Sequence, residues 1–270
     1  PSAGSQNVLA RFGDAGKVAA ECDVTVAVLG INKSIEREGQ DRFSLELPVD
    51  QQEFIKELYK VNPNTVVVLV AGSSMAVNWM DENVPAILNA WYPGEQGGNA
   101  VAEVLFGDYN PGGRLPLTYY NSLDEIPAFD NYSVKGRTYQ YFEGQPLYEF
   151  GYGLSYTKFR YKSKGVNVEQ DTVKVSFEVS NTGKYDGDEV AQVYVKYPET
   201  GTYMPLKQLH GFKRVHIKKG KTSKVTIGVP KKDLRYWDEQ ERKLVTPKGE
   251  YTFMVGASSD DIKFRETVGL

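Results

Sequence analysis

The sequence predicts two folds in succession, an α/β domain with a mostly parallel sheet and then an all-β domain built as an antiparallel sandwich. Residues 1–120 alternate short apolar runs with stretches of helical spacing, which is the pattern of parallel strands joined by helices. Residues 158–270 instead place apolar side chains at every second position, with turn residues between the runs. The intervening residues 121–157 are rich in glycine, proline and tyrosine and predict an ordered, aromatic linker.

The first domain is expected to contain three helices and three strands. The run at 24–29 is almost continuously apolar, as a parallel strand covered on both faces requires. Asp50 is a plausible N-cap for the helix that follows, with Glu53 three residues later. We expect helices at 10–21, 48–61 and 97–106, and strands at 24–29, 65–70 and 85–91.

The second domain is expected to be a sandwich of the immunoglobulin or fibronectin type III sort. Its alternating runs are separated by turn signals such as Asn181-Thr-Gly. Strands are expected near 159–168, 173–180, 189–197, 206–216, 222–229 and 250–257.

Composition excludes several classes of function. The 32 basic and 35 acidic residues leave a formal net charge of -3, so no global field favours nucleic acid or an anionic membrane. No apolar run approaches the roughly 20 residues of a transmembrane helix. A single cysteine, Cys22, excludes an intramolecular disulfide and any multi-thiolate metal site.

Residues 1–5 carry no signal-peptide features, but a processed chain would also lack them, and we expect a periplasmic or secreted protein.

The densest cluster of charge follows the first predicted strand. Glu36 and Glu38 precede Gly39, and Asp41 and Arg42 come directly after it. Loops at the carboxyl ends of parallel strands are where α/β proteins place their sites. A glycosidase needs two carboxyl groups, and such a loop can supply one of them. From spacing alone, however, a solvated charge run with a local ion pair is the favoured interpretation.

Other motifs have ordinary structural explanations. His210 and His216 do not match a zinc motif and are expected at strand positions, so we assign no metal. Ser73-Ser74 lacks the Gly-x-Ser-x-Gly pattern of a hydrolase nucleophile. The glycine clusters at 94–98 and 110–114 have no phosphate-binding spacing and are read as turns. The larger aromatic residues have two equally open roles, which are stacking on sugars at the surface and packing in a core. They are Trp79, Trp91, Trp237, Tyr92, Tyr139 and Tyr141.

Several motifs, in order, resemble the C-terminal portion of glycoside hydrolase family 3 in its β-xylosidase and β-glucosidase branches. They are Gly30-Ile-Asn-Lys-Ser-Ile-Glu-Arg-Glu-Gly-Gln-Asp-Arg-Phe-Ser-Leu-Glu-Leu-Pro48, Trp91-Tyr-Pro-Gly-Glu-Gln-Gly-Gly98, Val104-Leu-Phe-Gly-Asp-Tyr-Asn-Pro-Gly-Gly-Arg-Leu-Pro116, Gly136-Arg-Thr-Tyr-Gln-Tyr-Phe142 and Phe150-Gly-Tyr-Gly-Leu-Ser-Tyr-Thr157. The resemblance implies a partial α/β sandwich domain at 1–120, the linker at 121–157 and a fibronectin type III-like domain at 158–270.

The resemblance also implies how such a chain would act. In that family the nucleophile lies on an N-terminal (β/α)8 barrel, which these residues do not contain, and the acid/base glutamate comes from the loop after the first strand. It therefore places the acid/base at Glu36 or Glu38, and Glu36, three residues before Gly39, is preferred. Arg42 and Asp41 are expected to brace the loop. No cofactor is implied.

We therefore expect the C-terminal part of a retaining, exo-acting β-glycosidase that releases sugars from the non-reducing ends of plant-derived oligosaccharides. β-Xylosidase is favoured over β-glucosidase, and the chain would be inactive without its barrel partner. The alternative is a non-catalytic carbohydrate-associated or structural module.

Overall fold

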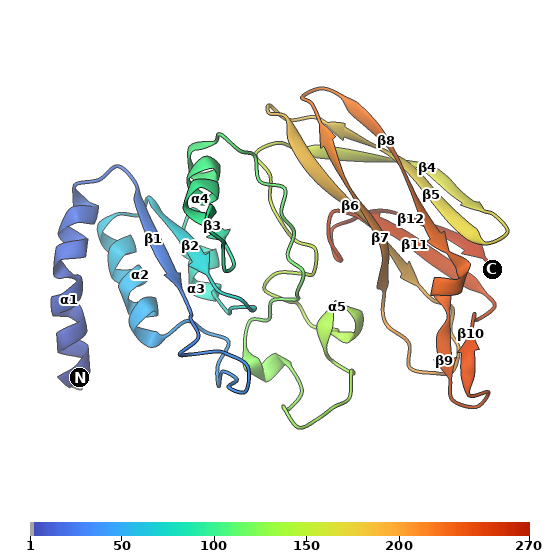
Figure 1. Cartoon of the computed structure of the whole chain (residues 1–270), viewed down its shortest axis with the longest axis horizontal. Helices are drawn as coiled ribbons and strands as arrows, with labels where there is room; N and C mark the ends of the chain where they lie inside the picture. Colours follow the sequence, from blue (N-terminus) through green and yellow to red (C-terminus); the bar gives the residue numbers. More distant parts are fainter. Residues whose placement is uncertain (1–2) are drawn as a thin grey trace. The chain divides into compact units, whose positions relative to one another are not determined.

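A computed structural model describes residues 3–270, with side chains from Phe12 onward (Figure 1). The chain forms two compact units. The first comprises the chain up to Leu105 together with Tyr119–Ile126, and the second comprises Phe106–Thr118 and Pro127–Leu270. The division at residues 120 and 157 stays a prediction from the sequence.

The first unit is built on a three-stranded parallel sheet in the order β1-β2-β3, as predicted. Its register places Gly30 of β1 opposite Val70 of β2, so the two strands end side by side. The central strand β2 is almost entirely buried, as its unbroken apolar run requires. The strands are β1 (Thr25–Gly30), β2 (Thr65–Val70) and β3 (Ala86–Asn89), and the helices are α1 (Ala3–Ala20), α2 (Val49–Val61), α3 (Asn78–Asn83) and α4 (Gly97–Phe106).

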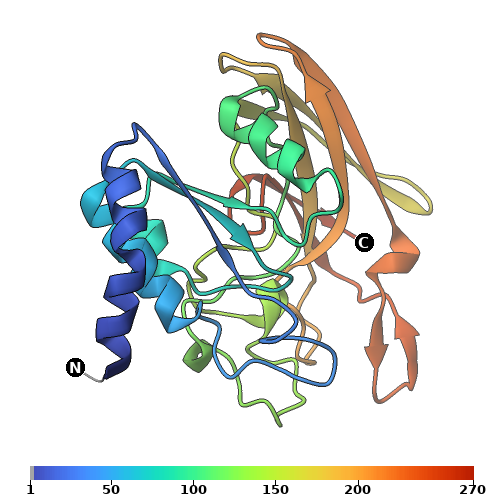
Figure 2. The same ribbon diagram turned by 60° about the vertical axis from the view of Figure 1, so that its left-hand side comes forward.

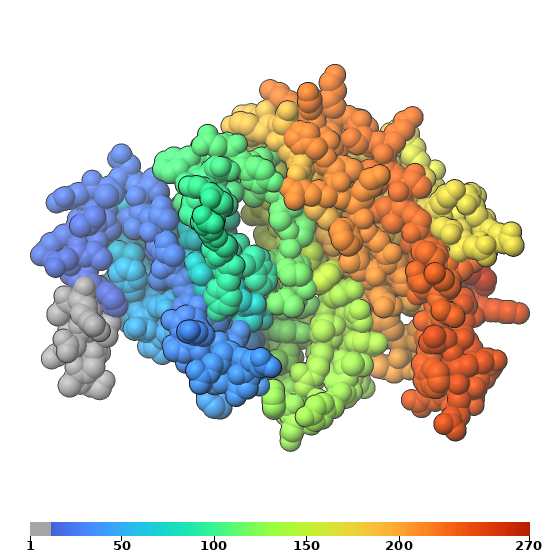
Figure 3. All heavy atoms as spheres, in the orientation of Figure 1, coloured from blue at the N-terminus to red at the C-terminus, as the bar shows by residue number. Residues whose placement is uncertain are grey.

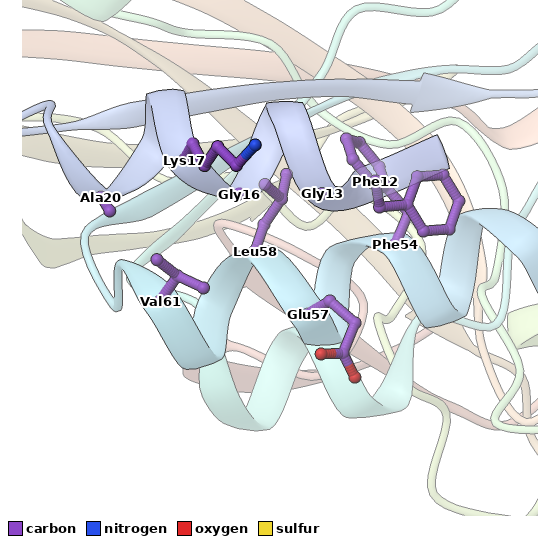
Figure 4. A pocket seen from close by; sticks show the side chains of 9 residues that line it. All are labelled: Phe12, Gly13, Gly16, Lys17, Ala20, Phe54, Glu57, Leu58 and Val61. Atoms are coloured by element: carbon purple, nitrogen blue, oxygen red, sulfur yellow. The ribbon is translucent and has the colours of Figure 1, made fainter. Parts of the chain in front are cut away.

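Helices α1 and α2 lie side by side (Figures 1 and 2). The ring of Phe12 packs on that of Phe54, with 4.7 Å between ring centroids. Beside this contact the helices leave an apolar groove of about 380 Å³, which opens where Gly13 and Gly16 carry no side chain (Figure 4). No helix in the described residues is long and apolar enough to cross a membrane.

Strand β1 departs from the prediction that both of its faces are covered. Ala27 and Leu29 are buried, but Val26 and Val28 are 46% and 65% exposed. The strand is also at the edge of the sheet, because β2 is its only partner among the described residues. Only one face of β1 is therefore covered within the described part of the chain.

The end of this edge strand is closed by a side chain. The amide of Gln51 donates to the Gly30 carbonyl and accepts from the Gly30 N–H, both at 2.8 Å. A Cβ at residue 30 would lie 1.8 Å from the Val70 carbonyl oxygen, and its φ of +153° is rare for L side chains. Glycine therefore lets the two strands converge where the following loop begins.

Asp50, predicted as the N-cap of α2, lies inside that helix instead. The helix is preceded by Pro48, whose carbonyl accepts the N–H groups of Gln51 and Gln52 at 2.9 and 3.1 Å. Among the described residues, no side chain caps this end, and the Asp50 carboxylate accepts only the neighbouring Gln51 N–H. The helix therefore begins at Val49, directly after Pro48, and Asp50 already lies in its first turn.

The second unit is an antiparallel sandwich of a four-stranded sheet, β12-β11-β6-β7, and a three-stranded sheet, β4-β5-β8. Alternate residues of both sheets form one core, which includes the fully buried side chains of Phe177, Val193 and Phe253. The strands are β4 (Phe159–Val168), β5 (Thr172–Asn181), β6 (Gly187–Lys196), β7 (Gln208–Ile217), β8 (Thr222–Pro230), β11 (Glu250–Gly256) and β12 (Ile262–Gly269).

Six of these strands match the predicted ranges closely, whereas the eight-residue strand β12 and several short elements were not predicted. The hairpin of β9 (Tyr236–Asp238) and β10 (Lys243–Val245) extends from the end of the sandwich in both ribbon views (Figure 2). The other unpredicted elements are β12, α3, α5 (Thr138–Tyr141), η1 (Leu123–Glu125) and η2 (Lys231–Leu234).

A buried ion pair ties the segment 106–118 to the sandwich. Nη2 of Arg114 lies 2.8 Å from Oε2 of Glu189, and the two side chains are 9% and 3% exposed. The other carboxylate oxygen, Oε1, accepts the Tyr161 hydroxyl at 2.6 Å. Burial and the adjacent carboxylate raise the pKa of Tyr161 well above its usual value, so the phenol stays a donor.

Candidate active-site loop

The carboxyl ends of β1 and β2 bring the predicted charge cluster next to residues from the following loop. Glu36 and Arg42 follow β1, and Ser73 and Ser74 follow β2. Because the strands are parallel and in register to their last residues, both loops start at the same edge of the sheet.

The loop after β1 holds Glu38 at the tip of a tight turn. The Asn32 carbonyl accepts the N–H groups of Ile35 and Glu36, which forms one helical turn. Arg37 and Gln40 then exchange backbone hydrogen bonds of 3.1 and 2.9 Å. Gly39 has a φ of +74°, which this turn position requires and glycine adopts without strain. Glu38 and Gly39 are thus the two central residues of the turn.

Glu36 is engaged by two donors. Its Oε2 lies 2.5 Å from Nε of Arg42 and accepts the Ser73 hydroxyl at 2.7 Å. The Glu36 side chain is 26% exposed and that of Arg42 only 8%. The contact with Ser73 joins residues 37 positions apart in the sequence.

Arg42 braces the loop, as predicted. Besides Glu36, its guanidinium donates to the Ser74 carbonyl at 2.8 Å and to the Leu45 carbonyl at 3.4 Å, and Nη1 lies 2.9 Å from the sulfur of Met75. The Asp41 side chain, predicted to help, is exposed and forms no hydrogen bond or ion pair with the described residues. The prediction for Asp41 is therefore wrong, because this residue follows the turn with its side chain in solvent, whereas the Arg42 side chain is buried.

Glu38 has different surroundings. Its side chain is exposed and forms no hydrogen bond or ion pair with the described residues. Phe43, a few residues on, is 99% exposed. The loop lies on the molecular surface, in mid-blue in the space-filling view (Figure 3). The structure thus separates the two candidates into one engaged carboxylate and one free carboxylate.

The third strand adds a second polar contact at the same edge. Asn89, the last residue of β3, donates its side-chain amide to the Tyr119 hydroxyl at 2.9 Å. Burial raises the pKa of Tyr119 to about 12, against smaller opposing effects of Asn89 and Arg42. Trp91 adopts a φ of +56°, which is uncommon for a bulky residue. The Tyr92 hydroxyl donates to the Ile31 carbonyl at 3.3 Å, so this strand end also supports the loop.

Sequence reasoning missed Ser73 as a partner of Glu36, and also Asn89 and Tyr119. Ser73 was considered only as a nucleophile, for which its pattern is unsuitable. The signal that identifies it is topological, because the residues that follow adjacent parallel strands meet at one edge of the sheet.

The remaining motifs have structural roles. His210 is largely buried and lies 2.9 Å from the Tyr197 hydroxyl, while His216 pairs with Asp188 at 2.7 Å on the surface. Within the described residues, no group of three or more His, Cys, Asp or Glu side chains could hold a metal ion. The Gly97 N–H donates to the Gly94 carbonyl, so that cluster is a turn leading into α4.

The larger aromatic residues divide between packing and exposure. Trp79 packs edge-on against Tyr59, and Tyr139 stacks on Phe150 at 4.3 Å between centroids. Trp237 on β9 is 55% exposed. None of these three is in the loop that carries Glu38.

Comparison with known proteins gives this loop a family context. Residues 4–156 match the model of the glycosyl hydrolase family 3 C-terminal domain, and residues 189–259 match a fibronectin type III-like domain. A xylan 1,4-beta-xylosidase of Xylanibacter ruminicola is 43% identical over 225 residues, which cover 83% of this chain and 26% of that protein. A beta-glucosidase of Kluyveromyces marxianus is 38% identical, covering 92% of this chain and 31% of the relative.

Solved structures agree. The crystal structure of the Kluyveromyces marxianus beta-glucosidase in complex with glucose superposes with a TM-score of 0.90 at 36% identity, covering 96% of this chain and 33% of that one. The chain therefore spans about a quarter to a third of the length of these relatives. It belongs to glycoside hydrolase family 3, with the family's C-terminal domain over residues 4–156 and a fibronectin type III-like domain over residues 189–259.

Proposed function

We propose that this chain is the C-terminal part of a retaining, exo-acting β-glycosidase and that the loop after β1 supplies the general acid/base. The nucleophile would come from a (β/α)8 barrel outside these 270 residues, in the same precursor or on a separate polypeptide, and the chain would be inactive without it. The observation that carries the proposal is the free, exposed carboxylate of Glu38 on a braced turn at the carboxyl edge of the sheet.

The sequence-based preference for Glu36 stays a prediction, and the contacts support Glu38 instead. A general acid must reach the leaving oxygen, give up its proton and later accept one from water. Oε2 of Glu36 already accepts hydrogen bonds from Arg42 and Ser73, which would have to break. Glu38 has no such contacts to break. We therefore assign the acid/base to Glu38.

The substrate class follows from the relatives. A β-xylosidase is favoured over a β-glucosidase because a xylan 1,4-beta-xylosidase and a beta-xylosidase of Formosa agariphila are 43% and 38% identical to the chain. Glucosides are also candidate substrates, because the Kluyveromyces marxianus beta-glucosidase is likewise 38% identical to the chain. Release of sugars from plant-derived oligosaccharides in the periplasm or outside the cell completes the proposal.

The test is a panel of aryl xylosides and glucosides hydrolysed by the complete enzyme, in which these residues are joined to or co-purified with the barrel. We expect faster turnover of xylosides. Glu38→Ala should lower turnover at least about 100-fold on substrates with poor leaving groups, and less on nitrophenyl glycosides that need no acid. Azide should partly restore the variant, because it attacks the glycosyl-enzyme without a base. Full activity of Glu38→Ala would refute the assignment.

A further inference from the structure

We propose that Glu36, Arg42 and Ser73 form a brace that positions Glu38. This inference rests on the proposed function, because it concerns the geometry of the same loop. The three residues would be positioning residues that fix the turn without touching the sugar.

The brace joins two loops that follow neighbouring strands. Arg42 bridges from Glu36, in its own loop, to the backbone carbonyl of Ser74, in the loop after β2. Ser73 reaches back in the other direction, from the loop after β2 to Glu36. The loop after β1 is therefore tied to the end of β2, whose strand is the most buried of the sheet.

The chemistry of the brace makes it stiff. The contact between the carboxylate and the guanidinium is charge-assisted, and such hydrogen bonds are roughly twice as strong as neutral ones. It is also sheltered, because only 8% of the Arg42 side chain is exposed to competing water. Replacement of Glu36 by a neutral side chain would leave a buried guanidinium without its anionic partner.

The brace holds both ends of the turn that carries Glu38. Glu36 stands two residues before Glu38 and Arg42 four residues after it, with the Arg37–Gln40 bridge between them. Because the side chains on either side of the turn are joined at 2.5 Å, this contact limits how far the ends of the turn can separate. A displacement of about 1 Å in a catalytic group can cost on the order of 100-fold in rate, so the brace would be kinetically important.

A first experiment measures the loop in the chain itself, independently of any enzyme activity. Amide hydrogen exchange over residues 31–42 is compared between the wild type, Glu36→Gln and Ser73→Ala. We expect exchange in the loop to accelerate at least about tenfold in Glu36→Gln and less in Ser73→Ala, which removes one neutral hydrogen bond. Glu57→Gln, which removes the same charge from an exposed pair with Lys60 on α2, is the matched control and should leave the loop unchanged.

A second experiment separates positioning from proton transfer in the complete enzyme. Glu36→Gln should lower kcat about 10- to 100-fold on activated and poor leaving groups alike, with little change in KM. It should keep the basic limb of the pH–rate profile and gain nothing from azide, since the carboxyl group of Glu38 is still present at the tip of the turn. Glu38→Gln should instead lose the basic limb.

Two results would overturn the inference. One is unchanged exchange over residues 31–42 in Glu36→Gln. The other is azide rescue of Glu36→Ala together with loss of the basic limb in Glu36→Gln, which would make Glu36 the acid/base. A complete enzyme without glycosidase activity would refute the proposed function alone, because the exchange experiment would still decide whether the brace exists.

Discussion

Removal of Glu189 should destabilise the second unit more than any single change on its surface. Glu189 is almost fully buried and accepts from both Arg114 and the Tyr161 hydroxyl. Nε of Arg114 already has no hydrogen-bond partner within the described structure, so its guanidinium depends on Glu189 for charge compensation. Glu189→Ala leaves this charge buried and unpaired.

The expected cost follows from these contacts. An unpaired buried charge costs about 3–5 kcal/mol, and the Tyr161 hydroxyl without its acceptor adds about 1 kcal/mol. We therefore expect the free energy of unfolding of the second unit to fall by about 4–6 kcal/mol, a large part of a typical domain's stability. In the double variant Arg114→Met with Glu189→Leu both charges are gone, and most of the loss should be recovered.

Native-state hydrogen exchange of the amides in β5 and β6 is the appropriate assay, because it reports on the second unit separately from the first. The loss of 4–6 kcal/mol corresponds to an acceleration of about 10³- to 10⁴-fold for amides that exchange through global unfolding. Lys174→Gln, which breaks the exposed pair with Glu169, is the control and should change stability by less than about 0.5 kcal/mol. A loss below about 1 kcal/mol in Glu189→Ala, or a double variant as unstable as the single one, would refute the reasoning.

Two further predictions concern the sandwich. Asn181 is 2% exposed, accepts from Thr157 and donates to the Ile217 carbonyl. Asn181→Ala should therefore lower the free energy of unfolding, measured by urea titration, by roughly 3 kcal/mol. A loss no larger than that of Thr182→Ala, at an exposed position, would contradict this. Burial lowers the pKa of His210, so protonation favours the unfolded state and stability should fall as the pH drops below about 6.5. Thermal unfolding between pH 7.5 and 5.5 should show a steeper loss for the wild type than for His210→Gln, and equal slopes would contradict the prediction.

Much of the fold could be predicted because its strands are either continuous apolar runs or clean alternations of apolar and polar residues. The run at 65–70 and the alternation at 159–168 coincide with β2 and β4. The helix α3 and the β9–β10 hairpin were missed because they are short and mix polar with apolar residues, which leaves no periodic signal. The N-cap prediction for Asp50 failed because the helix begins at Val49, directly after Pro48, so that Asp50 already lies in its first turn.

The candidate site was only half predictable. The glutamates and Arg42 lie within seven residues of one another, so a motif contains them all. Ser73 lies 37 residues from Glu36, and only the parallel register of β1 and β2 brings them together. The different surroundings of Glu36 and Glu38 could not be predicted at all, because the two residues have the same chemistry and differ only in position, Glu36 before the turn and Glu38 at its tip.

The Gln51 side chain has a consequence for how the sheet can grow. The N–H groups of Thr25 and Ile31 point toward β2. Because the backbone groups of successive residues in a strand point to opposite sides, the N–H and carbonyl groups of Val26, Val28 and Gly30 point toward the other edge of the strand. The Gln51 side chain forms hydrogen bonds with both the N–H and the carbonyl of Gly30, as a residue of a neighbouring strand would. A further strand added at this edge can pair along the two valines but must stop before Gly30. The sheet can thus be extended by another segment or chain while the turn that carries Glu38 stays clear.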